Sequence, residues 1–389
     1  MRTAYKFRIY PTKQQIAVLD VTLETCRHLW NDALEDRRSI YKETGKSVSY
    51  YDQQAILPNV KDHYPNVHSQ VQQDVLRRLK KAFDNFFRRI REHAKEKGYP
   101  RFKAEGRYNS ITYSQSGFKL EGTRLSLSKI PNTIRVFLHR EIEGNVKTCT
   151  IKRDKTNRWY VLFSVEKDNP AKVDIKTVVA VDLNLMKGKA VVTSDGQEFD
   201  YPRYYRKSEA NLRAAEKTLH RRKKGSKNRV KARIQVAQVS RRITNLRDEF
   251  CHQVSRKLVN SADAIIFEDL NILGMVKNHK YAKSISDVSW GKLIRYTQSK
   301  AESAGKTVVL VDPRNTSQLC SGCGEVVPKD LSVRIHNCPS CGLVLDRDYN
   351  AAQNILTRGL REIACGELTT TLSARSTASQ LCESGSPIL

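Results

Sequence analysis

Apolar residues near the start of the chain follow first the spacing of a strand and then that of helices. Residues 5–10 alternate between apolar and polar positions, which predicts a short strand. Thr12 and Gln15 then form a T-x-x-Q capping box, and apolar residues three or four apart run from 16 to 33. The same spacing predicts a second helix over 69–93. We therefore expect a strand followed by two long helices.

The predicted helix over 69–93 has an outward face rich in cations. These cations are Arg77, Arg78, Lys80, Lys81, Arg88, Arg89 and Arg91. A solvated helix surface explains such a face, and so does a surface that contacts nucleic-acid phosphates. Under the second interpretation the candidate phosphate contacts are Arg77, Arg78, Lys80 and Lys81.

Between residues 107 and 166 the period of the pattern changes to two. Short apolar runs, separated by Gly, Asp and Asn turns, lie at 110–113, 133–138, 147–151 and 159–165. They predict a small all-β, barrel-like module. Because the strand at 5–10 is too short to stand alone, we expect the helical region to be an insertion between that strand and the rest of this module. Residues 167–176 are predicted to form a linker.

Beyond the linker, buried strands alternate with helices. Apolar runs at 178–182 and 190–193 predict two strands, and an Asp-Gly turn then returns the chain into a third. Runs at 264–268 and 307–312 are typical of buried strands, and a helix is predicted between them over about 288–303. A strand, a helix and a strand in this order predict a βαβ unit, so these two strands should be parallel neighbours.

The stretch 203–257 is strongly helical and strongly basic. It holds 18 Lys and Arg against four Asp and Glu. An interruption at 221–227 predicts two antiparallel helices joined at a cationic tip. The tip residues that we expect to contact nucleic acid are Arg221, Arg222, Lys223, Lys224 and Lys227. Contacts to phosphates set the affinity and its salt dependence, and they carry no sequence specificity.

Composition and charge indicate which kind of molecule the protein binds. The 389 residues include 69 Lys and Arg against 41 Asp and Glu, a formal net charge of +28. The commonest polyanion that offsets such a charge is nucleic acid, although some proteins are simply basic. With 39% hydrophobic and 28% charged residues, the chain is typical of a folded protein. No stretch predicts a membrane span or a secretory signal, so a reducing cytoplasm is the expected location, with no membrane partner. In a prokaryotic cell, a chain that binds nucleic acid is expected at the nucleoid.

Four cysteines have the spacing of a metal site. Cys320 and Cys323 form one C-x-x-C pair, Cys338 and Cys341 form a second, and a glycine directly follows each pair. Two such pairs can bring four thiolates into tetrahedral geometry about 2.3 Å from one zinc ion. Buried structural thiols or an iron–sulfur cluster are the alternatives. A four-thiolate zinc site has no open coordination position, so it would be structural rather than catalytic.

Three carboxylates lie where an apolar strand ends or a helix begins. Asp182 closes one predicted strand, Glu268 closes another, and Asp348 starts the last predicted helix. If they converge at one edge of a sheet, two Mg²⁺ ions could bind there and support phosphodiester hydrolysis. Each acid alone is more often a cap or a turn residue. Asp269 next to Glu268, and Asp346 next to Asp348, leave open which member of each pair faces the site.

Seven segments together resemble the transposon-encoded TnpB family, which is related to the type V CRISPR nucleases. The segments are YKFRIYPTKQQ from residue 5, ITYSQSGFKL from 111, AVDLNL from 180, FEDLNILGM from 267, DVSWGKL from 287, DPRNTSQLCSGCG from 312 and LDRDYNAAQNIL from 345. The resemblance covers nearly the whole chain except its tail. The combination of segments is highly specific, although each segment alone is a weak signal.

The resemblance implies a multidomain protein of the α+β and α/β classes. A β-barrel wedge module would carry an inserted helical recognition module, and a RuvC-like nuclease of the RNase H fold would carry an inserted zinc ribbon. The implied boundaries are 1–10 and 107–172 for the wedge, 11–106 for the recognition module, 173–311 and 345–360 for the nuclease, 312–344 for the zinc ribbon, and 361–389 for a disordered tail.

The function that the resemblance implies is RNA-guided cleavage of double-stranded DNA next to a short adjacent motif, with a guide RNA encoded beside the gene. By the same resemblance the catalytic acids are Asp182, Glu268 and Asp348. The alternatives are a repressor that keeps guided binding without cleavage, and a zinc-ribbon transcription factor. A single-strand transposase would need two histidines separated by one residue, and no two of the nine histidines have that spacing.

Overall fold

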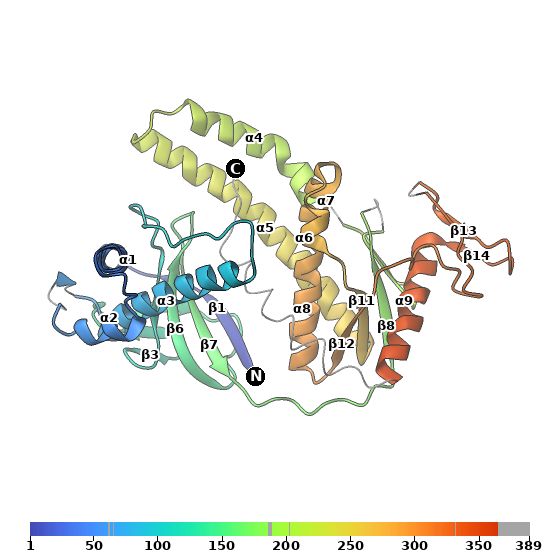
Figure 1. Ribbon diagram of the computed structural model, residues 1–389, viewed down its shortest axis with the longest axis horizontal. Coiled ribbons are helices and arrows are strands. Elements are labelled where there is room, and N and C mark those ends of the chain that lie inside the picture. Colours follow the sequence, from blue (N-terminus) through green and yellow to red (C-terminus); the bar gives the residue numbers. More distant parts are fainter. Residues whose placement is uncertain (61–62, 65, 186–188, 202, 331, 365–389) are drawn as a thin grey trace. The chain divides into compact units, whose positions relative to one another are not determined.

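The computed structural model divides the chain into two compact units, Met1–Asp168 and a second unit that begins at Asn169 (Figure 1). The residues that it describes are 1–60, 63–64, 66–185, 189–201, 203–330 and 332–364. The boundary between the units falls in the predicted linker 167–176, which contains no helix or strand. We describe each unit by itself.

The described part of unit 1 combines three α-helices with a seven-stranded antiparallel sheet. The helices are α1 (Lys13–Thr44), α2 (Tyr50–Ile56) and α3 (Ser69–Arg91). The strands are β1 (Arg2–Tyr10), β2 (Ser110–Tyr113), β3 (Phe118–Glu121), β4 (Arg124–Leu127), β5 (Ile134–Phe137), β6 (Asn145–Arg153) and β7 (Trp159–Glu166). Their order in the sheet is β2-β6-β7-β1-β5-β4-β3. As predicted, β1 pairs with strands that follow the helical region in sequence.

The sheet of unit 1 approaches a barrel without closing into one. The strand order leaves β2 and β3 at its two ends. The hydroxyl of Tyr113, at the end of β2, donates a hydrogen bond of 3.0 Å to the carbonyl of Ser128, just after β4. The two ends of the sheet therefore come near each other. The apolar residues of the sheet and of the helices share one core, which includes Phe7, Leu19 and Leu79.

Unit 2 is built on a five-stranded mixed sheet. Its strands are β8 (Val178–Leu183), β9 (Val191–Thr193), β10 (Glu198–Phe199), β11 (Ala264–Glu268) and β12 (Thr307–Val311), in the order β10-β9-β8-β11-β12. Strands β8, β11 and β12 are parallel, and β9 and β10 are antiparallel. The predicted parallel pair is confirmed. Three parallel strands end at one edge of the sheet, which brings the residues after them to that edge.

Six helices and a two-stranded ribbon complete the described part of unit 2. The helices are α4 (Tyr204–Arg221), α5 (Lys227–Ser261), α6 (Ile272–Met275), α7 (His279–Val288), α8 (Trp290–Ser303) and α9 (Arg347–Ala364). The ribbon pairs β13 (Ile335–Asn337) with β14 (Val344–Asp346). Helices α4 and α5 form the predicted hairpin (Figure 1). Across the described ranges, no helix has the length and apolar character that crossing a membrane requires.

The two faces of the unit 2 sheet bury different helices. Ala180, Ile266 and Val309 point to one face and pack with Ile355 of α9. The alternate residues of the same strands, Val179, Ile265 and Val308, belong to the core that contains residues of α5 and α8. Helix α9 therefore covers the face that carries Ala180 and every second residue after it on β8.

The end of α9 corrects the predicted boundary of the tail. The sequence predicted a disordered tail from 361, because apolar periodicity fades there. Residues 361–364 are instead the last turn of α9, which ends at Ala364. The remainder of that prediction, residues 365–389, lies outside the described residues.

Gly359 lets α9 approach the sheet, which yields a stability prediction. A Cβ atom at this position would lie 2.2 Å from Cδ1 of Ile266 on β11. Gly359→Ala is therefore expected to lower the free energy of unfolding by about 1–3 kcal/mol, the usual cost of overpacking. Denaturant unfolding measures it. Gly291→Ala on α8 is the matched control, because its nearest contact would be an ordinary 3.5 Å. Equal effects of the two substitutions would contradict this account of α9 packing.

Candidate active site

Two of the predicted acids come from neighbouring parallel strands. Val181 of β8 pairs in register with Phe267 of β11, and Asp182 and Glu268 are the next residue on each strand. Side chains at matching positions of parallel strands point to the same face. Asp182 and Glu268 lie two residues beyond Ala180 and Ile266, so both point to the face that α9 covers.

The third acid comes from the first turn of α9. The Oδ1 atom of Asp346 accepts hydrogen bonds from the backbone N–H of Asp348, at 2.9 Å, and of Tyr349, at 3.3 Å. Asp346 is thus the N-cap of α9, and its other oxygen forms an ion pair of 3.1 Å with Lys189. Asp348 is buried, with 6% of its surface exposed. The cap and the inward-facing acid are therefore two different residues.

The charges of the two other acids act on Asp182. Burial raises the pKa of Asp182 well above its ordinary value, and the negative charges of Glu268 and Asp348 raise it further. The cations Arg347 and Arg334 act in the opposite direction on the same pKa. A cation would offset the repulsion that Asp182 meets from Glu268 and Asp348, and carboxylate oxygens are ligands that suit Mg²⁺. The chemistry of the donor set therefore fits the divalent cations that the sequence predicted, and in this structure the carboxylate oxygens are not all within 4.8 Å of one another.

Glu268 is held by a residue that sequence reasoning missed. The residue is 7% exposed, and its Oε1 accepts a hydrogen bond of 2.5 Å from the hydroxyl of Thr316. Burial raises the pKa of Glu268, while this hydrogen bond and the charge of Arg358 lower it. Asp269 lies directly after the strand, and its N–H donates to the carbonyl of Val311 on β12. Alternation along β11 therefore gives the inward position to Glu268.

Arg334 is the second residue that the sequence did not reveal. Its Nη2 atom donates to both carboxylate oxygens of Asp348, at 2.8 and 2.7 Å. Arg347, which is buried, donates to the carbonyls of Asp330 and Val333 and thereby ties this segment to the start of α9. No motif distinguishes Arg334 from the many other arginines of the chain. Only the fold brings it to the carboxylates.

We expect Arg334→Ala to lower the affinity of the carboxylates for Mg²⁺ about ten- to hundredfold, the usual cost of removing a group that orients a metal ligand. Asp348 would lose both hydrogen bonds that fix its carboxylate. Titration calorimetry with Mg²⁺ measures the effect. Arg334→Lys is the matched control, because an ammonium can reach the same two oxygens and should restore most of the affinity. Unchanged Mg²⁺ affinity of Arg334→Ala would contradict this role.

The four predicted zinc ligands form one cluster. Among the residues that the structure describes, only Cys320, Cys323, Cys338 and Cys341 bring ligand atoms within 4.8 Å of one another as a group. The Sγ atoms of Cys320 and Cys341 are 3.6 Å apart, and those of Cys323 and Cys338 are 3.5 Å apart. Tetrahedral thiolates at 2.3 Å from zinc would be about 3.8 Å apart. The spacing therefore fits one Zn²⁺.

Local backbone geometry makes each cysteine pair a tight turn. The N–H of Gly324 donates to the carbonyl of Cys320, and the N–H of Gly342 donates to that of Cys338. Both glycines have positive φ angles, 79° and 73°, which other residues rarely adopt. Backbone N–H groups, first that of Cys341, lower the pKa of Cys338 to about 6. This thiol is thus readily deprotonated, as a zinc ligand must be.

One of the predicted phosphate contacts on α3 is wrong. Arg78 does not lie on the outer face: it pairs with Asp74 at 2.7 Å and donates to the carbonyl of Ser110 and the hydroxyl of Thr112. Arg78 lies next to the buried side of α3, so its long side chain bends inward and contacts strand β2. Arg77 and Lys81 are exposed, and Lys80 is half-buried and pairs with Asp84 at 2.7 Å.

The tip of the α4–α5 hairpin carries the other predicted contacts. Arg221, Arg222, Lys223 and Lys224 are exposed, and Lys227 begins α5. Arg229 donates to the carbonyls of Leu219 and Arg222, which holds the turn together. The tip therefore has a defined backbone that presents several cations.

Three family models match separate parts of the chain. They are described as a helix-turn-helix domain at residues 1–46, a probable transposase at 161–279, and the TNB domain of Cas12f1-like proteins at 290–355. In the structure, residues 1–46 contain strand β1 and the long helix α1. The third match includes all four clustered cysteines.

Full-length relatives decide the family. A Streptomyces pristinaespiralis protein named "Putative RNA-guided DNA endonuclease" is 35% identical over 378 residues, which cover 94% of this chain and 92% of that protein. The chain belongs to the TnpB family. Another relative of this TnpB-family chain, "Putative RNA-guided DNA endonuclease InsQ" of Escherichia coli K12, is 28% identical over 388 residues and 94% of each protein.

A solved structure shares the fold of this TnpB-family chain. It is the cryo-EM structure of a Cas12f1 complex with a single guide RNA and target DNA, with a TM-score of 0.58 and 13% sequence identity. The match covers 91% of this chain and 98% of the Cas12f1 chain. At this identity the likeness shows the fold alone, which is of mixed α/β type.

Proposed function

We propose that this TnpB-family chain is an RNA-guided endonuclease that cuts double-stranded DNA next to a short adjacent motif. The observation that carries the proposal is that Asp182 and Glu268 follow paired positions of β8 and β11, while the charge of Asp348 on α9 acts on Asp182. The names of the full-length relatives agree with it. The excess of positive charge suits a protein that holds RNA and DNA together.

The proposal assigns a role to each part of the fold. Residues 173–311 and 345–360 form the RuvC-like nuclease, of the RNase H fold, and 312–344 form a zinc ribbon inserted before its last helix. In unit 1, residues 1–10 and 107–172 form the wedge module, and 11–106 form the recognition module. The mixed sheet order and the position of the cysteine cluster between β12 and α9 support this assignment.

The carboxylates are the proposed ligands of two Mg²⁺ ions. When bound, Mg²⁺ activates a water and stabilises the leaving oxygen in phosphodiester hydrolysis. The chain's own contribution is to hold the three acids in place: the strand register fixes Asp182 beside Glu268, Thr316 orients Glu268, and the Asp346 cap fixes the first turn of α9. The carboxylate oxygens are not all within 4.8 Å of one another, and Arg334 occupies both oxygens of Asp348.

The proposed partners are a guide RNA, encoded beside the gene, and the target DNA. Base pairing with the guide would read the target, while the protein reads the adjacent motif and the shape of the heteroduplex. Cations at the hairpin tip and on α3 are suited to contact phosphates without sequence preference. A zinc ion at the four cysteines would be structural, because the site leaves no ligand position open.

A repressor that binds without cutting is less well supported. Such a protein needs no carboxylate cluster, yet here three acids share a buried site with their own supporting contacts. Burying like charges costs free energy, and a binding protein gains nothing from that cost.

The test is to purify the full chain from cells that carry its native locus and to sequence the RNA that co-purifies. The 3′ part of that RNA gives the guide, which can then be replaced to direct the complex to a chosen DNA. We expect cleavage of that DNA with Mg²⁺ and none with EDTA. If RNA co-purifies but no matched target next to any flanking sequence is cut, the repressor is the correct function. If no RNA co-purifies, guided cleavage is excluded.

A further inference from the structure

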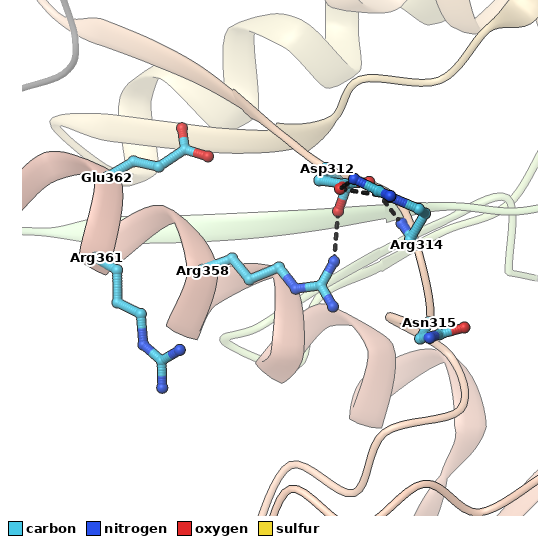
Figure 2. A pocket seen from close by; sticks show the side chains of 6 residues that line it. All are labelled: Asp312, Arg314, Asn315, Arg358, Arg361 and Glu362. Atoms are coloured by element: carbon cyan, nitrogen blue, oxygen red, sulfur yellow. Dashed lines mark hydrogen bonds and ion pairs between the residues drawn. The ribbon is translucent and has the colours of Figure 1, made fainter.

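A cavity of about 460 Å³ lies at the end of β12, at the same edge of the unit 2 sheet as the carboxylates (Figure 2). Its lining residues are Asp312, Arg314 and Asn315, which follow β12, and Arg358, Arg361 and Glu362 of α9. None of these six residues belongs to the carboxylate cluster or to the cysteine cluster.

Strand register places the cavity one strand away from the carboxylates. Glu268 of β11 pairs with Val311 of β12, and Asp312 is the next residue. Neighbouring strands are about 4.8 Å apart. Arg358 lies between the two sites: its Nη1 donates to the carbonyl of Asp312 at 2.6 Å, and its charge acts on Glu268. The cavity therefore continues the carboxylate edge of the sheet.

The cavity has three arginines against two acids, Asp312 and Glu362, and this excess of one positive charge favours an anion. Nε and Nη2 of Arg314 contact Oδ2 of Asp312 at 2.7 and 2.6 Å, so this acid is already neutralised inside the cavity. Arg358 uses one donor on the Asp312 carbonyl and keeps further N–H groups for a ligand. Arg361 is exposed and lies three residues further along α9, a spacing at which residues are neighbours on a helix surface. Figure 2 shows its guanidinium directed away from the contact between Arg358 and Asp312.

We propose that this cavity binds a backbone phosphate of the single DNA strand that passes through the carboxylate site. This inference rests on the proposed function and adds to it the path of the strand. Two guanidinium groups from one helix face suit the oxygens of a phosphate, because each presents a fork of N–H donors. Arg358 and Arg361 lie ten and thirteen residues after Asp348 on α9, about 15 and 20 Å along the helix, so the bound phosphate is several nucleotides from the bond that is cut.

The experiment measures DNA binding without cleavage. Full-length chain loaded with its guide RNA is titrated, in EDTA, into a labelled ten-nucleotide oligo-dT, and fluorescence anisotropy gives the affinity at several salt concentrations. Arg361→Ala is expected to weaken binding about fivefold and to lower the slope of log affinity against log salt by about 0.7, the loss of one phosphate contact. Arg361→Lys should keep most of the affinity. Glu362→Gln removes a negative charge from the cavity and should strengthen binding.

The matched control is Arg295→Ala. Arg295 is an exposed arginine on α8, which packs on the other face of the sheet, so its loss removes the same charge away from the cavity. Loss of structure alone cannot explain opposite signs for Arg361→Ala and Glu362→Gln. Equal effects of Arg361→Ala and Arg295→Ala would overturn the proposal, as would weaker binding by Glu362→Gln. It is also overturned if an RNA oligonucleotide binds more tightly than DNA and responds to Arg361→Ala in the same way.

Failure of this inference is separable from failure of the proposed function. Binding in EDTA needs no cleavage, so a chain that cuts no DNA could still show the predicted changes in affinity. Conversely, the chain could cut a guided target with Mg²⁺ while Arg361→Ala and Arg295→Ala have equal effects on binding. That result supports the proposed function and contradicts the proposed path of the DNA strand.

Discussion

Asp182→Ala is expected to lower guide-directed DNA cleavage by about 10³-fold or more. This loss exceeds the ten- to hundredfold loss that usually follows the substitution of a residue that only orients a metal ligand. Asp182 is the acid on which the charges of Glu268 and Asp348 both act, so its loss removes the centre of the carboxylate cluster. Guide RNA binding should stay within severalfold, because unit 1 and the hairpin tip do not depend on this side chain. Single-turnover cleavage and RNA filter binding measure the two quantities.

Neighbouring acids give the control for this prediction. Glu268→Gln should reduce cleavage as severely, since the carboxylate charge is lost while the side chain keeps its size. Asp269→Asn, one residue further, should retain cleavage within about severalfold, because alternation along β11 turns it away from the α9 face. Unaltered cleavage by Asp182→Ala, or equal losses for Glu268→Gln and Asp269→Asn, would contradict the site.

Cys320→Ser is expected to abolish zinc binding and to unfold the segment between β12 and α9. Structural zinc contributes about 10–16 kcal/mol to folding of zinc-finger peptides, far more than this short segment gains from its small apolar content. Arg334 lies in the segment and contacts Asp348, so cleavage should fall at least about hundredfold as well. Zinc content by mass spectrometry should drop from one ion per chain to none.

Ser340→Ala is the matched control within the same turn. Ser340 is exposed and lies between the ligands Cys338 and Cys341, without a sulfur of its own. It should keep one zinc ion and full cleavage. Retention of zinc by Cys320→Ser, or loss of cleavage with zinc still bound, would show that the cysteine cluster does not act as this account states.

Long periodic segments were the part of the fold that sequence predicted best. The capping box of Thr12 and Gln15 is present at the start of α1, and the break at 221–227 separates α4 from α5. Short elements were predicted only in part. The four-residue strands β2 and β5 were predicted from their apolar alternation, whereas strands β3 and β4, also of four residues, and helices α2 and α6, of seven and four, were not. So few residues give at most two repeats of a period, so tertiary packing decides the conformation of most such elements.

Some residues of the candidate site could likewise be predicted from the sequence, and others could not. Carboxylates that close apolar strands could be found from the sequence, because a charge at the end of a buried run is unusual. Which of Asp346 and Asp348 caps α9 needed the hydrogen bonds. Arg334 and Thr316 reach the acids only through the fold. Arg78 was mistaken for a surface cation because a helical pattern does not show where a long side chain bends.

The most direct test of the account is to locate the metal itself. Crystals of the full chain with its guide RNA and target DNA, soaked with Mn²⁺, would show the bound ions by anomalous scattering. The account predicts anomalous peaks bounded by the carboxylates of Asp182, Glu268 and Asp348, with Arg334 moved off at least one oxygen of Asp348. Peaks elsewhere in the complex, with Asp348 still paired to Arg334 and no ion beside Asp182, would contradict it.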